Sequence, residues 1–82
     1  MNSDFKIITE LAAGEVHISE HSQYNEINAD KVTVNEKITA RLFGTVKDIT
    51  LKKDSKLYLH GKILGNVVNE GGEIQIFNHG QR

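Results

Sequence analysis

Apolar positions in the second half of this chain recur every 17 residues. The sets that keep this step are Val34, Leu51 and Val68; Ala40, Leu57 and Ile74; Leu42, Leu59 and Ile76; Gly44 and Gly61; and Val46 and Ile63. Within each repeat, one polar residue separates paired apolar residues, which is the alternation of a half-buried β-strand. So short a repeat cannot hold a helix, a turn and a strand. It predicts one coil of an all-β, short-coil, single-stranded β-solenoid (β-helix), whose coils share a core.

The repeat extends toward the N-terminus if one residue of slippage is allowed. Residues 11–18 align with residues 27–34 at a step of 16, and residues 44–51 and 61–68 follow at steps of 17. Each block is predicted to hold two short strands around a two-residue corner; the corners are Gly14-Glu15, Asp30-Lys31, Lys47-Asp48 and Leu64-Gly65. A third strand lies between blocks, at residues 40–42, 57–59 and 74–76. Three strands and three corners per coil predict a roughly triangular cross-section, with four to five coils in all.

Alternation along these strands assigns side chains to the core or to solvent. The residues predicted to line the core include Val46, Ile49, Leu51, Ile63 and Val68. The Thr, Lys and His residues between them are expected to face solvent.

Two segments depart from the pattern. Residues 19–25 are polar except for Tyr24, so we expect a looser loop with Tyr24 as its apolar anchor. Asn66 occupies a position where the other blocks carry Val or Ile. Either Asn66 points inward with its amide hydrogen-bonded to a turn backbone or to a neighbouring Asn, or the strand shifts by one residue and Val67 points inward.

The N-terminal segment fits two patterns. Phe5, Ile8 and Leu11 have helical spacing, and a short helix could cap the open end of a solenoid. Ile7, however, lies four residues before the block that begins at Leu11. Ala40, in a predicted third strand, lies four residues before the block that begins at Gly44. Because of this match we favour a strand. Residues 1–10 are therefore a first strand or a cap. Residues 78–82 are predicted to be a frayed tail, and residues 1–82 form a single domain.

Composition narrows the function classes. The chain of 82 residues has no Cys and no Pro, so disulfides and thiolate metal sites are excluded. Its net charge of −1 argues against a general nucleic-acid binder. Residues 1–37 carry a net charge of −4 and residues 38–82 carry +3. There is no apolar run long enough for a membrane span and no visible secretory signal, so a cytoplasmic location is expected.

The residues that could carry chemistry do not form a recognisable site. His17 and His21 fall in a strand and the loop after it, without a zinc-binding motif, and His60 and His79 each precede a Gly, so all four are expected on the solvated surface. No Ser has a Gly-x-Ser-x-Gly setting. We expect no enzyme activity, no catalytic residues, no cofactor or metal site and no small-molecule substrate.

Two local resemblances suggest a family. The segments Ala29-Asp30-Lys31-Val32-Thr33-Val34, Gly44-Thr45-Val46-Lys47-Asp48-Ile49 and Gly61-Lys62-Ile63-Leu64-Gly65-Asn66-Val67 resemble the repeats of bactofilins. Bactofilins are bacterial, polymer-forming cytoskeletal proteins built on a right-handed β-helix, so this resemblance implies a self-assembling structural protein. More weakly, residues 68–80 are similar to one repeat of an autotransporter adhesin passenger.

Two functions follow as hypotheses. The first is a structural or scaffold protein that forms homo-oligomers or polymers through its solenoid ends, with Phe5 and Phe77 as candidate end contacts. Opposite charge on the two halves favours head-to-tail stacking, whereas the resemblance implies filaments without polarity. The alternative is a small protein-binding module, such as an immunity or antitoxin-type inhibitor. Its candidate face is the outward stripe of Arg41, Lys56, Tyr58 and Gln75.

Overall fold

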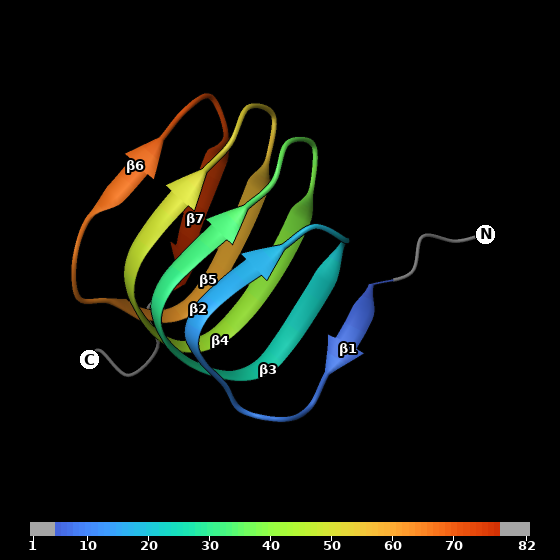
Figure 1. The fold of residues 1–82 in the computed structure, drawn as a ribbon, viewed down its shortest axis with the longest axis vertical. Coiled ribbons are helices and arrows are strands. Elements are labelled where there is room, and N and C mark those ends of the chain that lie inside the picture. Colours follow the sequence, from blue (N-terminus) through green and yellow to red (C-terminus); the bar gives the residue numbers. More distant parts are fainter. Residues whose placement is uncertain (1–4, 78–82) are drawn as a thin grey trace.

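Seven parallel β-strands form successive coils of a solenoid (Figure 1), as shown by a computed structural model that describes residues 5–77. The strands are β1 (Lys6–Ile8), β2 (Ala12–Ile18), β3 (Ser22–Val34), β4 (Thr39–Leu51), β5 (Lys56–Ile63), β6 (Val67–Asn69) and β7 (Glu73–Phe77). Their order is β1-β3-β4-β5-β7, with β2 beside β3 and β6 beside β4. This arrangement confirms the predicted all-β solenoid. The predicted tail, residues 78–82, lies outside the described residues.

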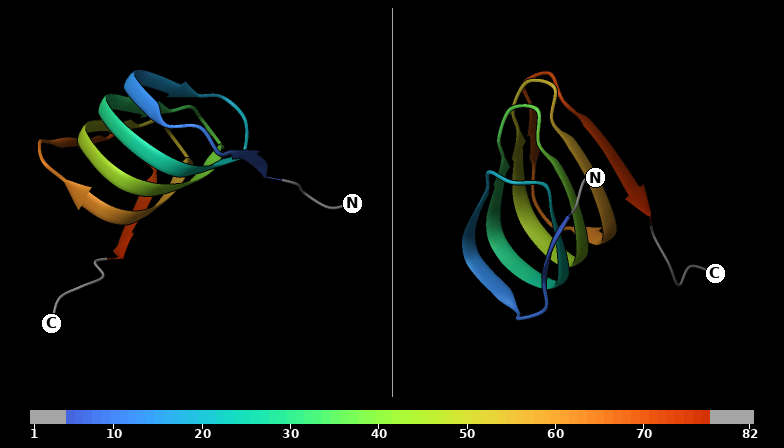
Figure 2. Two further views of the ribbon diagram at one scale, coloured as in Figure 1. Left: turned by 90° about the horizontal axis from the view of Figure 1, so that it is seen from below. Right: turned by 90° about the vertical axis from the view of Figure 1, so that its right-hand side faces the viewer.

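The 17-residue step holds through the middle of the solenoid. Ala40 on β4 lies opposite Leu57 on β5, which lies opposite Ile74 on β7. Leu42, Leu59 and Ile76 form a second column in the same way. The predicted corners at Asp30-Lys31 and Lys47-Asp48 lie inside β3 and β4, because parallel pairing with the neighbouring coils resumes directly after each bend. Figure 2 shows these long strands curving around the core.

The core is aliphatic. Its fully buried apolar residues are Ile18, Ile27, Ala29, Val32, Val34, Ala40, Leu42, Val46, Ile49, Leu51, Leu57 and Leu59. The core assignments of Val46, Ile49 and Leu51 are confirmed, and Ile63 is half-buried against the core. No aromatic ring is fully buried within residues 5–77, which suits the narrow interior of a short coil.

The first block aligns differently from the sequence prediction. Ala12, and not Leu11, lies opposite Ile27, and the register shifts by one residue after Gly14. Asp30 is the extra residue at this bulge. Residues 12–14 therefore pair with β3 at a step of 15, and residues 15–18 pair at the predicted step of 16.

The prediction of a loop at residues 19–25 is wrong from Ser22 onward, where β3 begins. Ser22 lies opposite Ala40 and is buried; its hydroxyl donates a hydrogen bond of 2.7 Å to the carbonyl of Glu20. Tyr24 lies opposite Leu42 and packs against the core, which confirms it as the apolar anchor. Backbone pairing with both β1 and β4 makes this polar segment a strand.

The last coil also differs, because three residues (64–66) replace the two-residue corner between β5 and β6. Ile49 therefore lies opposite Val67 and Leu51 opposite Asn69. The core assignment of Val68 is wrong, and this side chain is exposed. Asn66 is exposed and does not point into the core, and its backbone N–H donates a hydrogen bond of 2.9 Å to Oδ1 of Asp48. The alternative, a shift that gives Val67 the inward register, is confirmed.

At the N-terminus the strand is confirmed over the helix. Lys6 lies opposite Ser22 and Ile8 opposite Tyr24 on β3. Ile8 thus continues the column of Leu42, and Ile7 points outward. No helix within residues 5–77 is long and apolar enough to cross a membrane.

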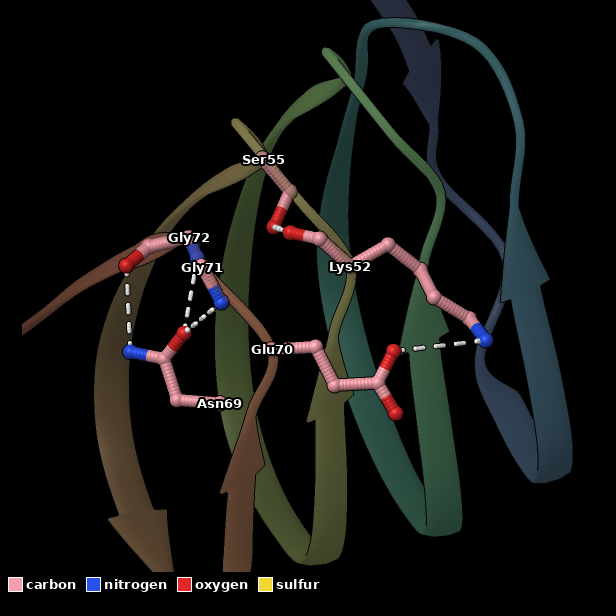
Figure 3. A network of polar contacts seen from close by, with 6 residues as sticks. All are labelled: Lys52, Ser55, Asn69, Glu70, Gly71 and Gly72. Carbon is pink, nitrogen blue, oxygen red and sulfur yellow. Dashed lines mark hydrogen bonds and ion pairs between the residues drawn. The ribbon is translucent and has the colours of Figure 1, made fainter.

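The turns that follow β3, β4 and β6 stack on one another through backbone hydrogen bonds, and Figure 3 shows the polar contacts of the last two. In the last turn, Oδ1 of Asn69 accepts hydrogen bonds from the N–H groups of Gly71 and Gly72, at 2.9 and 2.7 Å. Lys52 of the preceding turn forms an ion pair of 3.7 Å with Glu70. These contacts fix the loops that hold the coils in register.

Candidate functional site: an outer aromatic face and two unlike ends

Three rings stack on the outside of the solenoid. Phe43 on β4, His60 on β5 and Phe77 on β7 occupy one outward column. The centre of the His60 ring lies 4.5 Å from each of the two Phe rings, with interplanar angles of 7° and 11°. We name this column the aromatic ladder. It exists because parallel in-register strands place residues 17 apart directly beside one another.

The predicted binding stripe lies on the same outer face. Arg41, Tyr58 and Gln75 form one outward column, two residues before the ladder on each strand. Lys56 lies two residues before Tyr58, between Thr39 and Glu73 of the neighbouring strands. The structure thus brings all four stripe residues together with the ladder.

Arg41 is held in place by two neighbours. Its Nη1 donates a hydrogen bond of 3.1 Å to Oε1 of Gln23, and its Cζ lies 5.4 Å from the centre of the Phe5 ring. That distance is within the range of a cation–π contact. Phe5, predicted as an end contact, therefore also belongs to the outer face.

The ladder and the stripe enclose a shallow hollow. It has a volume of about 460 Å³ and is lined by Arg41, Phe43, Tyr58, His60 and Phe77. We name it the aromatic hollow. Phe43 and His60 were missed by sequence reasoning, although their 17-residue spacing with Phe77 is visible in the chain.

This face holds most of the aromatic residues of the protein. Of the three Phe and two Tyr, only Tyr24 points to the core side; Phe5, Phe43, Tyr58 and Phe77 lie outside. Aromatic rings and Arg are enriched in the energetically dominant parts of protein interfaces. The outer aromatic face is therefore a candidate binding surface.

The C-terminal end of the solenoid leaves core columns uncovered. Ile76 is 50% exposed, although Leu42 and Leu59 in the same column are fully buried. Val67, Val68 and Phe77 are also exposed in this last coil. β6 and β7 each pair on one side only within the described chain (Figure 2), so their outer edges have unpaired backbone groups.

The N-terminal end is different, because a charged residue occupies a core column. Lys6 lies in register with Ser22, Ala40, Leu57 and Ile74. Its ammonium group forms an ion pair of 3.7 Å with Glu20. The side chains around it line a hollow of about 240 Å³ that includes Lys6, Ile8, Glu20, Ser22 and Tyr24. This end is therefore more polar than the C-terminal end.

The histidines do not assemble a metal site in the described part of the chain. His17 is exposed, and Nδ1 of His21 accepts a hydrogen bond of 3.0 Å from the N–H of Thr39. His60, expected on the solvated surface, is instead half-buried in the ladder. Within residues 5–77 no three His, Asp or Glu side chains come close enough to hold a metal ion.

Comparison with known proteins adds no relative. No family model matches the chain, and no curated protein and no solved structure matches it at a significant level. The fold and its surfaces define the class of this protein, a short β-solenoid with about four coils.

Proposed function

We propose that this protein is a structural or scaffold protein that associates with itself through its solenoid ends, as its resemblance to bactofilins implies. The observation that carries the proposal is the exposure of Ile76, which is 50% exposed although Leu42 and Leu59 in the same column are fully buried. A second copy is the natural cover, because its end has the same outline and the same unpaired strand edges.

The C-terminal end makes the stronger contact. Burying apolar surface there stabilises the complex by about 25 cal/mol per Å². Val67, Ile76 and Phe77 of one copy meet the same residues of the other in a contact with two-fold symmetry, which is self-complementary by construction. The primary product is a rod of two copies joined at their C-terminal ends.

Head-to-tail stacking is disfavoured by Lys6. Head-to-tail contact would place the Lys6 ammonium group over Ile74 of the next copy. The ammonium group would then lose its hydration, and burying a charge without a buried partner costs free energy. An inward-pointing charge on an edge strand is a known means of blocking such pairing.

The charge argument for head-to-tail stacking also weakens when the net charges of the first and last coils are compared. Residues 5–21 carry one basic and three acidic side chains, and residues 61–77 carry one basic and two acidic. Both ends are thus slightly negative. The excess of basic residues lies in the coil before the last, at Lys47, Lys52, Lys53 and Lys56.

The experiment is sedimentation velocity over a concentration series. The wild-type protein is expected to shift from monomer to dimer as concentration rises, and Ile76→Glu is expected to remain monomeric. Ile7→Glu is the matched control, because Ile7 is also 50% exposed but points outward from the first coil. A wild-type protein that is monomeric at every concentration would contradict the proposal. So would equal loss of association in both variants.

A further inference from the structure

We infer that the aromatic hollow binds an extended peptide segment of a partner protein that carries a carboxylate beside aliphatic side chains. This inference does not rest on self-association, since the hollow lies on the outer face of β4, β5 and β7. It is carried by three features: the orientation of the rings, the Arg41 cation beside them and the openness of the hollow.

The rings present their edges outward. Because Phe43, His60 and Phe77 stack nearly parallel at 4.5 Å, their faces are turned toward one another along the solenoid axis. The edge of a phenyl ring carries partial positive charge, and its face carries partial negative charge. The ladder therefore offers an apolar surface that also favours carbonyl and carboxylate oxygens.

One cation, Arg41, lies beside these edges. The guanidinium of Arg41 lines the hollow and is oriented by Gln23 and Phe5. Lys56 lies on the same face but farther along β5, outside the lining of the hollow, with Glu73 opposite it on β7. Neither cation forms an ion pair with a carboxylate within residues 5–77, where the two ion pairs are Lys6–Glu20 and Lys52–Glu70. A pre-oriented Arg of this kind suits a carboxylate ligand.

The shape of the hollow favours a peptide over other ligands. Sugars and nucleobases bind aromatic side chains through ring faces, but both faces of His60 are covered by Phe43 and Phe77. Small molecules bind in enclosed pockets that bury most of their surface, whereas this hollow is open along its outer side. It crosses three strands spaced about 4.8 Å apart, a distance that three or so residues of an extended chain span.

The test is titration of the ¹⁵N-labelled protein with three synthetic octapeptides, followed by amide chemical shifts. One peptide alternates Glu and Leu, the second Lys and Leu, and the third Glu and Ser. The Glu/Leu peptide is expected to give saturable shifts centred on the five residues of the hollow. The other two peptides are expected to bind at least tenfold more weakly, since each lacks one half of the required chemistry.

Matched variants separate the site from general charge attraction. Arg41→Gln and Tyr58→Ser are expected to weaken binding of the Glu/Leu peptide at least tenfold. Lys47→Gln changes net charge as Arg41→Gln does, but at an exposed corner away from the hollow, and is expected to leave binding unchanged. The amide spectrum of each variant reports whether it is folded.

Several outcomes would overturn the inference. These are equal binding of the Lys/Leu peptide, shifts centred elsewhere, or undiminished binding by Arg41→Gln. If 4-phenylbutyrate binds as tightly as the peptide, the hollow is a small-molecule site. If the amides of Arg41, Phe43, Tyr58 and His60, which lie outside the proposed end contact, shift on simple dilution of the unliganded protein, the occupant of the hollow is a second copy. Either result contradicts the peptide assignment.

Discussion

Lys6 occupies at the N-terminal end of the solenoid the same register position that Ile74 occupies near the C-terminal end. One column of the core thus begins with a charged residue and ends with an apolar one. A solenoid has two ends that must be capped, paired or protected. In this protein the described residues protect one end with charge and leave the other apolar.

Replacing that charge is expected to change the assembly. Lys6→Leu continues the apolar column to the N-terminal end and removes the barrier to pairing there. We expect rods longer than dimers, detected as faster-sedimenting species and as filaments by negative-stain electron microscopy. Loss of the Lys6–Glu20 ion pair should matter little, because both side chains are exposed. Lys31→Leu, an exposed lysine on β3, is the control. Dimers that are unchanged by Lys6→Leu would contradict this prediction.

Gly61 is required by close approach of two coils. Its φ is 156°, and a Cβ there would overlap the carbonyl oxygen of Gly44 on the preceding coil. We expect Gly61→Ala to lower the free energy of unfolding by about 3 kcal/mol or more, because the backbone must move apart or strain. Gly14→Ala is the control: φ is 75°, but nothing lies within 4 Å of the added Cβ, and the expected cost is about 1 kcal/mol. Urea denaturation measures both; equal costs would argue against the close stacking at Gly61.

Leu59 tests the aliphatic core. This side chain is fully buried between Leu42 and Ile76 of the neighbouring coils. We expect Leu59→Ala to cost about 2–5 kcal/mol, which is enough to unfold much of so small a domain. Leu64→Ala, at a side chain that is largely exposed, is expected to change the free energy of unfolding by less than about 0.5 kcal/mol. Similar effects of both changes in urea denaturation would contradict the core assignment.

Alkaline pH should destabilise the fold through Tyr24. Burial, with a smaller contribution from the charge of Glu20, raises the pKa of Tyr24 above its usual value of 10.0. Above pH 10 the unfolded chain loses this proton before the folded protein does, so the free energy of unfolding falls until the pH passes the folded-state pKa. Thermal unfolding measured between pH 8 and pH 11.5 should show a weaker decline for Tyr24→Phe than for the wild type. Identical slopes would remove Tyr24 as the cause.

The sequence predicted the coil repeat and most of the core because parallel coils place equivalent residues one step apart. Leu42, Leu59 and Ile76 fall in one column for this reason, and so do Arg41, Tyr58 and Gln75. Such columns follow directly from the spacing. The joint location of the stripe residues could therefore be derived before the structure.

Leu11 and Val68 were misplaced because the step between coils changes near each of them. The bulge at Asp30 and the longer corner at residues 64–66 each add one residue without a sequence signal strong enough to mark it. Ser22 was missed because its buried position accepts a small polar side chain whose hydroxyl bonds to Glu20. The ladder was missed because His60 was judged alone as a surface residue, whereas its environment depends on the rings one coil away on either side.

The central claim, association at the C-terminal ends, is tested most directly by two spin-label distances. The chain has no Cys, so Glu73→Cys in β7 and Glu10→Cys in the first coil each give a single labelling site. Four strand spacings of about 4.8 Å separate β1 from β7 in each copy. Contact between C-terminal ends predicts a distance between two labels at position 73 that is shorter than that at position 10 by roughly 40 Å, because both copies contribute these spacings. Head-to-tail stacking gives the same distance for both labels, and this result, or a shorter distance at position 10, would contradict the account.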